Sequence, residues 1–232
     1  MRAVLFDLDG TLLDLDLRSF LRRYFAALEV ASAPLVSDGS GSASRFMAAL
    51  QSAVGMMMEP HPGRTNQEVF YADLHEHTGV DLHVHWPVFE RFYAEVFPTL
   101  QDTAAPMLGG RDAVLAAMDL GLGVAIATNP IFPLAAIEQR LRWAGLDDLD
   151  LPVVTSYETM RACKPHPEYY RQTAALLDVP AQECLMVGDD RALDLPAADI
   201  GMRTFYVGGD EHAAADLRGT LTELAELLPR LV

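Results

Sequence analysis

Four short apolar runs constrain the fold of this chain more than any other feature. They cover residues 3–6, 124–127, 152–154 and 185–187, and they are followed by Asp7, Thr128, Thr155 and Gly188. Such runs are typical of strands buried on both faces of a parallel sheet, with polar groups at their carboxyl ends. A further strand is expected at residues 204–207.

Helical patterns separate these strands. Residues 111–120 carry apolar side chains at helical spacing before Gly121, and residues 134–144 repeat this arrangement before Gly145. Glycine at such positions is a common helix stop. Further helices are expected at residues 167–178 and 220–228. Alternation of strands and helices predicts an α/β fold, a doubly wound parallel sheet with helices on both faces.

One long stretch, residues 15–104, interrupts this alternation directly after the first strand. It has helical patterns of its own at residues 18–30, 46–58, 66–77 and 88–97. Residues 37–44, rich in serine and glycine, are expected to form a loop within it. The sequence therefore predicts a catalytic core of residues 1–14 and 105–232, with an α-helical cap domain inserted at residues 15–104.

Composition limits the partners that this chain can have. Its 232 residues carry a net charge of −16, which argues against nucleic acid because binding a phosphate backbone normally takes a basic surface. The first apolar run is too short for a signal peptide, and no later run is long enough to cross a bilayer. The two cysteines, Cys163 and Cys184, fit a reducing compartment. We expect a cytoplasmic protein with no membrane partner.

Two carboxylates follow the first strand in the sequence Asp7-Leu8-Asp9-Gly10-Thr11. Residues i and i+2 of a strand share a face, so Asp7 and Asp9 can point into one site. Paired carboxylates repel each other unless a cation holds them or one is protonated, which is a first indication of a metal. Gly10 permits a sharp turn and offers an N–H to an oxyanion, and the hydroxyl of Thr11 can orient a neighbour.

Polar residues also follow the later strands. Thr128 follows the second strand, Lys164 comes after the third, and Gly188-Asp189-Asp190 closes the fourth. Because the carboxyl ends of parallel strands share one edge of an open sheet, we expect these residues to meet Asp7 and Asp9 in one crevice.

In these four motifs and their order, the chain resembles the haloacid dehalogenase superfamily. The resemblance is to its phosphatases with a helical cap inserted after the first motif, similar to phosphoglycolate phosphatase. It rests on Asp7-Leu8-Asp9-Gly10-Thr11, Thr128, Lys164, and Gly188-Asp189-Asp190 with Asp194 following. The cap matches by its position in the chain and not by a sequence signature.

The resemblance implies a role for each residue. Asp7 would be the nucleophile that forms an aspartyl-phosphate, and Asp9 the general acid and base. The phosphate would be held by Gly10, the Thr128 hydroxyl, the Asn129 N–H and Lys164. Magnesium, which prefers oxygen ligands, would be bound by Asp7, the backbone carbonyl of Asp9, and Asp189. Thr11, Asp190 and Asp194 would support these ligands from outside.

The implied activity is magnesium-dependent hydrolysis of a small phosphorylated metabolite. Members of the superfamily that cleave carbon–halogen bonds typically carry an aromatic residue at the position of Asp9, and phosphonatases carry a small one. A phosphomutase acting on a sugar phosphate with the same aspartate pair is an alternative. Two alternatives of another class are a phospho-aspartate signalling module and a non-catalytic interaction module.

Overall fold

A six-stranded parallel sheet forms the centre of the computed structural model, which describes residues 1–35 and 43–232. The strand order is β5-β4-β1-β6-β7-β8, and every neighbouring pair is parallel. The strands are β1 (Ala3–Phe6), β4 (Gly123–Ile126), β5 (Val153–Val154), β6 (Cys184–Gly188), β7 (Arg203–Tyr206) and β8 (Leu217–Arg218). The predicted parallel sheet is confirmed. The two-residue strand β8 extends it and was not predicted from the sequence.

Side chains of the central strand β1 alternate between two apolar layers. Val4 and Phe6 belong to a layer that includes residues of α5 (Gly110–Asp119), α6 (Leu134–Trp143) and α8 (Leu221–Leu227). Ala3 and Leu5 belong to a second layer, built largely with α7 (Pro167–Leu176). Because successive strand residues face opposite sides of a sheet, helices cover both faces, as in a doubly wound fold.

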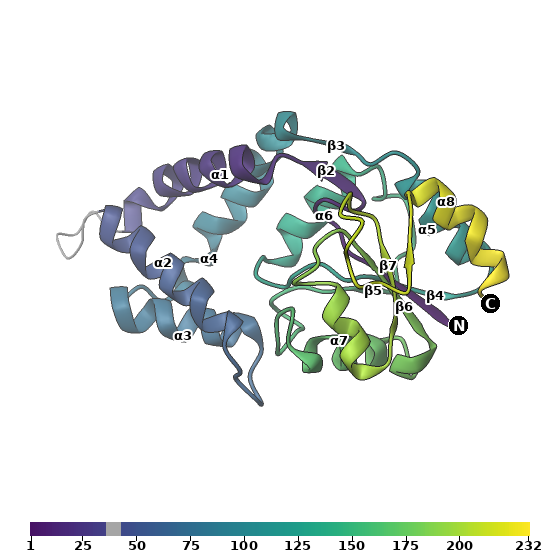
Figure 1. Ribbon diagram of the computed structural model, residues 1–232. Coiled ribbons are helices and arrows are strands. Elements are labelled where there is room, and N and C mark those ends of the chain that lie inside the picture. Colours follow the sequence, from purple (N-terminus) through teal and green to yellow (C-terminus); the bar gives the residue numbers. More distant parts are fainter. Residues whose placement is uncertain (36–42) are drawn as a thin grey trace.

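Four helices lie apart from this sheet, grouped on one side of the molecule in Figure 1. They are α1 (Leu17–Ser32), α2 (Ala43–Met58), α3 (Asn66–Thr78) and α4 (Leu82–Arg91). The chain leaves the core through β2 (Leu13–Leu15) and returns through β3 (Ala104–Pro106), which pair as an antiparallel ribbon. Exit and return therefore lie side by side, near the ends of the predicted insertion.

The last helix of this segment differs from the prediction of a helix at residues 88–97. Helix α4 begins at Leu82, where the side chain of Asp81 accepts a hydrogen bond from the N–H of His83 at 2.9 Å. It ends at Arg91 and continues as a π-helical turn, Phe92–Val96, and a 3₁₀ helix, Phe97–Thr103. Pro87 lies inside α4, and because proline removes a helical hydrogen bond, the sequence pattern gives a poor guide to where this helix starts.

Short 3₁₀ helices complete the described chain at Ala33–Leu35, Ala181–Glu183, Leu195–Ile200 and Leu228–Arg230. The predicted loop at residues 37–44 falls outside the described residues, except for its last two, which begin α2. Within the described chain, we find no helix with the length and apolar character needed to span a bilayer.

Candidate active site

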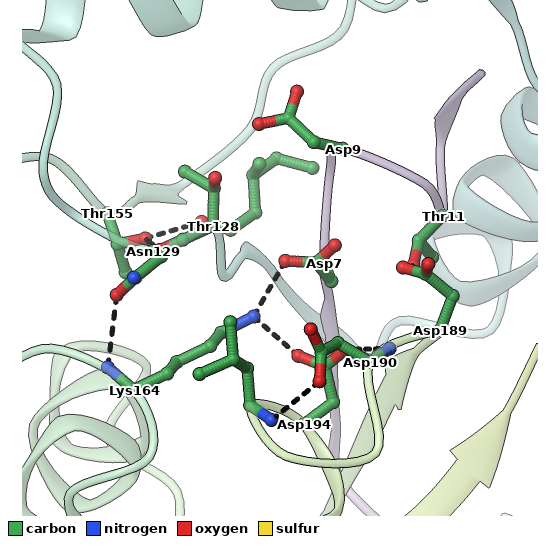
Figure 2. Close-up of polar contacts among 12 residues, drawn as sticks. Asp7, Asp9, Thr11, Thr128, Asn129, Thr155, Lys164, Asp189, Asp190 and Asp194 are labelled. Atoms are coloured by element: carbon green, nitrogen blue, oxygen red, sulfur yellow. Dashed lines mark hydrogen bonds and ion pairs between the residues drawn. The ribbon is translucent and has the colours of Figure 1, made fainter. Parts of the chain in front are cut away.

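The four strand ends meet around a pocket of about 330 Å³. Asp7 directly follows β1 and donates its backbone N–H to the carbonyl of Val187 on the neighbouring strand, at 2.8 Å. Of the ten residues predicted from the sequence, all but Thr11 line this pocket, and Figure 2 shows how they are grouped. The predicted convergence at one edge of the sheet is therefore observed.

Lys164 lies between two carboxylates at the centre of the site. Its Nζ donates to Oδ1 of Asp7 at 2.7 Å and to Oδ1 of Asp194 at 2.6 Å (Figure 2). Its side chain is only 1% exposed, and it is the sole lysine of the sequence. Burial alone would lower the pKa of Lys164, but the charges of Asp194 and Asp7 outweigh it and raise this pKa well above its usual range. The ammonium group thus stays charged beside Asp7.

Asp194 has a more direct place in the site than Asp190. Its carboxylate is 1% exposed, and its second oxygen accepts the N–H of Asp190 at 3.0 Å. Burial raises the pKa of Asp194, and Lys164 opposes that shift. A Cβ at Gly188 would lie 2.1 Å from this carboxylate, so only glycine leaves room for it. Asp190 is exposed and accepts the N–H groups of residues 192 and 193, which shapes the turn.

Asp189 is fixed by the turn that follows β1. The hydroxyl of Thr11 donates to Oδ1 of Asp189 at 3.0 Å, which matches the orienting role expected of that hydroxyl. Gly10 has a φ of +90°, and a Cβ there would lie 2.4 Å from Oδ2 of Asp189. The expected N–H of Gly10 for an oxyanion needs correction, because it is bonded to the carbonyl of Leu13 at 2.8 Å as the turn closes.

Three carboxylates in this pocket suit a divalent cation. Asp7, Asp189 and Asp194 each offer an oxygen, and these oxygens lie within 4.8 Å of one another. Burial, and then the charge of Asp7, raises the pKa of Asp189, which is the expected effect of crowding anions without a cation. Hard oxygen donors of this kind fit Mg²⁺. The side chain of Asp9 is not part of this cluster, so its expected place among the ligands depends on its backbone carbonyl alone.

Asp9 instead forms an ion pair with Arg140, a residue that sequence reasoning missed. The guanidinium group comes from α6, is 1% exposed, and lies 4.6 Å from the ring centroid of Phe132. Burial raises the pKa of Asp9, and the charge of Arg140 opposes the rise. Oδ1 of Asp9 and Nη2 of Arg140 have no hydrogen-bond partner among the described residues. In Figure 2 the carboxylate of Asp9 points away from Asp7.

The loop after β4 is held by residues from two other elements. The carbonyl of Thr128 accepts from the hydroxyl of Thr155 at 2.7 Å and from that of Tyr169 at 2.9 Å. Oδ1 of Asn129 accepts the N–H of Lys164 at 3.1 Å, so this loop also positions the lysine. Thr155 could have been found as the polar residue at the end of a predicted strand. Tyr169 gave no such signal.

Comparison with known proteins supplies a family for this architecture. Residues 1–199 match the family model of the haloacid dehalogenase-like hydrolases. Hexitol phosphatase B of Escherichia coli (strain K12) is 29% identical over 144 residues, which cover 59% of this chain and 64% of that protein. Two further curated relatives are matched over 40% and 46% of their lengths. The chain thus spans less than two thirds of the curated relatives that it matches.

Solved structures share the fold over nearly the whole chain. A HAD phosphatase from Thermococcus onnurineus superposes with a TM-score of 0.61 at 23% identity, covering 98% of each chain. L-2-haloacid dehalogenase from Xanthobacter autotrophicus superposes with a TM-score of 0.57 at 17% identity, covering 100% of each chain. Proteins with both kinds of name have this fold, so the fold does not by itself select a reaction.

Proposed function

The chain belongs to the haloacid dehalogenase-like hydrolase family, and within it we propose that this protein is a magnesium-dependent phosphomonoester hydrolase acting through an aspartyl-phosphate. The observation that carries the proposal is the environment of Asp7. Its carboxylate lines an open pocket, contacts the ammonium group of Lys164 at 2.7 Å, and lies beside Asp189 and Asp194. A nucleophile, a fixed cation and a set of metal ligands therefore surround one space.

Asp7 performs the first chemical step. Of the two carboxylate oxygens of Asp7, Oδ1 accepts the hydrogen bond from Lys164, so Oδ2 is the atom that attacks phosphorus while the bond from phosphorus to the ester oxygen breaks. Lys164 balances charge on the transferred group, and the Thr128 hydroxyl and the Asn129 N–H bind its oxygens. Asp7, Asp189 and Asp194 would hold Mg²⁺, which neutralises charge on the phosphoryl oxygens when bound.

Asp9 transfers the protons in both chemical steps. It lines the same pocket as Asp7, on the part of the wall that Arg140 also forms. Protonated Asp9 gives its proton to the leaving oxygen as the ester bond breaks. It then takes a proton from the water that attacks phosphorus, and the bond from phosphorus to Oδ2 of Asp7 breaks. Inorganic phosphate leaves, Asp7 is again a free carboxylate, and Asp9 is again protonated.

The helical segment 15–104 acts as a cap in this proposal. The side-chain amide of Asn66 donates to the carbonyl of Pro130 at 2.9 Å, next to Thr128 and Asn129. His166 bonds the carbonyl of Met58 at 2.9 Å through its ring nitrogen. The ends of α2 and α3 thus contact the phosphate-binding side of the core, where a cap can exclude water and limit substrates to small molecules.

Phosphate release from a generic aryl phosphate tests this proposal. We expect release that requires Mg²⁺, stops with a chelator and is lost in Asp7→Asn. Asp14→Asn is the matched control, because Asp14 is exposed on β2 and outside the pocket lining. Activity that survives in Asp7→Asn at the level of Asp14→Asn would remove Asp7 from the mechanism and contradict the proposal.

The same assay separates hydrolysis from the phosphomutase alternative. A mutase returns the phosphoryl group to a sugar hydroxyl and depends on a bisphosphate activator, whereas a phosphatase transfers it to water. We expect one inorganic phosphate per ester consumed, with no activator added. Turnover that appears only with a sugar bisphosphate, without net phosphate release, would favour the mutase.

A further inference from the structure

We propose that the leaving group of the substrate is compact and apolar, and that it occupies a second cavity which shares lining residues with the catalytic pocket. This inference rests on the proposed phosphatase function and names the class of ester on which it acts. It excludes sugar and polyol phosphates as preferred substrates.

The part of the cap that the structure describes presents apolar side chains to the catalytic pocket. Among the described residues of segment 15–104, those that line it are Leu15, Leu17 and Leu21. The core adds Ile131 and Phe132 from the loop that follows Thr128 and Asn129. Beyond the carboxylates, Thr128, Asn129, Lys164 and Arg140, the pocket offers mainly apolar surface, which stabilises an apolar group by removing it from water.

A second cavity of about 90 Å³ lies beside this surface, lined by residues of the cap helices and of the core. Leu21, Ile131 and Phe132 line both spaces, so the two share a wall. The cavity extends from there toward Val54 of α2 and Trp86 of α4. The apolar cavity thus lies next to the pocket in which Asp7 would hold a phosphate.

The lining of this cavity carries few polar atoms. Among the described residues that line it, none is charged, and the hydroxyls of Tyr24 and Tyr93 bond each other at 3.0 Å. Burial raises the pKa of Tyr24 to about 12, so it stays neutral. Burial, and then the neighbouring Tyr71, raises the pKa of Tyr157, so its hydroxyl also stays neutral. A sugar hydroxyl placed here would lose its water in a largely apolar lining, which is unfavourable.

The size of the cavity limits the group that it can hold. An engineered apolar cavity of about 150 Å³ binds benzene, which has six carbon atoms. By proportion, a cavity of about 90 Å³ holds about four carbon atoms, such as a branched alkyl chain. The preferred ester is therefore an alkyl phosphate with a short branched chain.

A ladder of esters tests the inference on the unmodified protein. We expect kcat/KM, measured with Mg²⁺, to rise from methyl to ethyl, propyl and isobutyl phosphate by about fourfold per methylene group, the value for burying one CH₂. A hexitol phosphate should lie below isobutyl phosphate. Equal values along the ladder, or a polyol phosphate above every alkyl ester, would overturn the inference.

A pair of matched variants places the effect in the cavity. Val54→Phe fills the cavity from α2, and Val84→Phe adds the same ring on α4 at a position that is 67% exposed. We expect Val54→Phe to reduce the ratio of kcat/KM for isobutyl over methyl phosphate, and Val84→Phe to keep the wild-type ratio. An unchanged ratio in a folded Val54→Phe protein would contradict the assigned location.

The outcomes also separate this inference from the function on which it rests. If no phosphate ester is hydrolysed with Mg²⁺, the proposed function fails and the inference fails with it. If esters are hydrolysed but polyol phosphates are preferred, the phosphatase stands and only the apolar leaving group is wrong. Because the series of alkyl esters is measured on the unmodified protein, the inference can be tested even if Val54→Phe misfolds.

Discussion

The guanidinium group of Arg140 is ion-paired with the carboxylate of Asp9, the residue proposed as general acid and base. The two residues are 131 positions apart in the sequence, with segment 15–104 between them, and α6 places Arg140 beside Asp9. Arg140 is 1% exposed, whereas Asp9 is 24% exposed. The pair therefore fixes one carboxylate of the first motif from the core, while the other carboxylate, Asp7, is fixed by Lys164.

Replacing Arg140 with methionine should lower the free energy of unfolding by about 3 kcal/mol, because it leaves the largely buried carboxylate of Asp9 without a cation. Methionine keeps an apolar stem against Phe132, so the loss reports mainly on charge. Urea unfolding measures it. Asp9→Asn in the same chain should recover part of the loss, and a double variant whose cost equals the sum of both single costs would contradict the coupling.

Arg111→Met is the matched control for that experiment. Arg111 also pairs with a carboxylate, that of Asp148 at 2.6 Å, but these side chains are 40% and 65% exposed. Exposed pairs contribute about 1 kcal/mol or less. A similar loss at both sites would mean that burial of Arg140 adds nothing.

Lys164 should resist amine-reactive labelling in the folded protein. It is the sole lysine of the sequence and 1% exposed, so a reductive methylation reagent has two amines to attack, Lys164 and the N-terminal one. We expect the N-terminal amine of the native protein to react and Lys164 to react only after unfolding. Mass spectrometry of the digested protein distinguishes the two sites. Equal rates in the native state would place Lys164 in solvent and contradict its contacts with Asp7 and Asp194.

The sequence predicted the central part of this architecture because its signals are local. A buried strand followed by a polar residue is readable at Asp7, Thr128 and Asp189, and the common edge of a parallel sheet implies that these residues meet. The Asp9–Arg140 pair could not be predicted in this way, since it depends on how α6 packs. A weaker signal existed, because helical spacing places Arg140 on the same buried face as Ala136 and Ile137.

Other features were not predicted correctly from the sequence, for the same physical reason. The N–H of Gly10 looked available for an anion, yet the turn uses it for the carbonyl of Leu13, a contact that depends on the three-dimensional path of the loop. Asp194 could not be distinguished from Asp190 by position alone. Only the packing against Lys164 shows that Asp194 is the buried partner. Helix α4 was misplaced because Pro87 obscures its start.

Asp189 should make stability depend on pH in magnesium-free buffer. Its pKa in the folded chain is raised by burial and by the charge of Asp7. The folded state therefore binds this proton more tightly than the unfolded state, whose pKa is about 4. The contribution of Asp189 is present at low pH and is lost as pH rises from about 4 through the raised pKa.

Thermal unfolding of wild type and Asp189→Asn across this pH range isolates that contribution, because other carboxylates cancel in the difference. We expect wild type to lose stability relative to the variant as pH rises. Millimolar Mg²⁺ should reduce the loss in wild type by neutralising the carboxylates. A difference that grows with pH in favour of wild type without Mg²⁺ would reverse the assigned direction of the pKa shift.

Gly10→Ala should weaken magnesium binding in addition to destabilising the fold. The new Cβ would lie 2.4 Å from Oδ2 of Asp189 and force this carboxylate to move. Gly63 is a matched control, because its φ of +87° is close to the +90° of Gly10 and no atom lies within 4 Å of its Cβ position. Alanine at a positive φ costs more than about 1 kcal/mol at either site. The magnesium concentration for half-maximal activity should rise about tenfold or more in Gly10→Ala, and an equal response in Gly63→Ala would contradict the role of Gly10.

Thr155→Val should slow catalysis without removing any group that contacts phosphate. The hydroxyl of Thr155 donates to the carbonyl of Thr128 at 2.7 Å, and Tyr169 donates to the same carbonyl. Losing one of the two donors costs about 1 kcal/mol of stability and lets the loop with the Thr128 hydroxyl shift. A displacement of about 1 Å at a catalytic group can cost on the order of 100-fold in rate, so we expect kcat to fall by about tenfold or more.

Thr173→Val is the matched control for Thr155→Val. The buried hydroxyl of Thr173 also donates to a backbone carbonyl, that of Tyr169 at 2.9 Å, but within α7 and outside the pocket lining. Both variants lose one buried hydroxyl, and both should lose about 1 kcal/mol of stability. Only Thr155→Val should lose rate, because only its partner carbonyl belongs to the loop that is proposed to bind phosphate. Equal kcat values in the two variants would show that the loop keeps its position without Thr155.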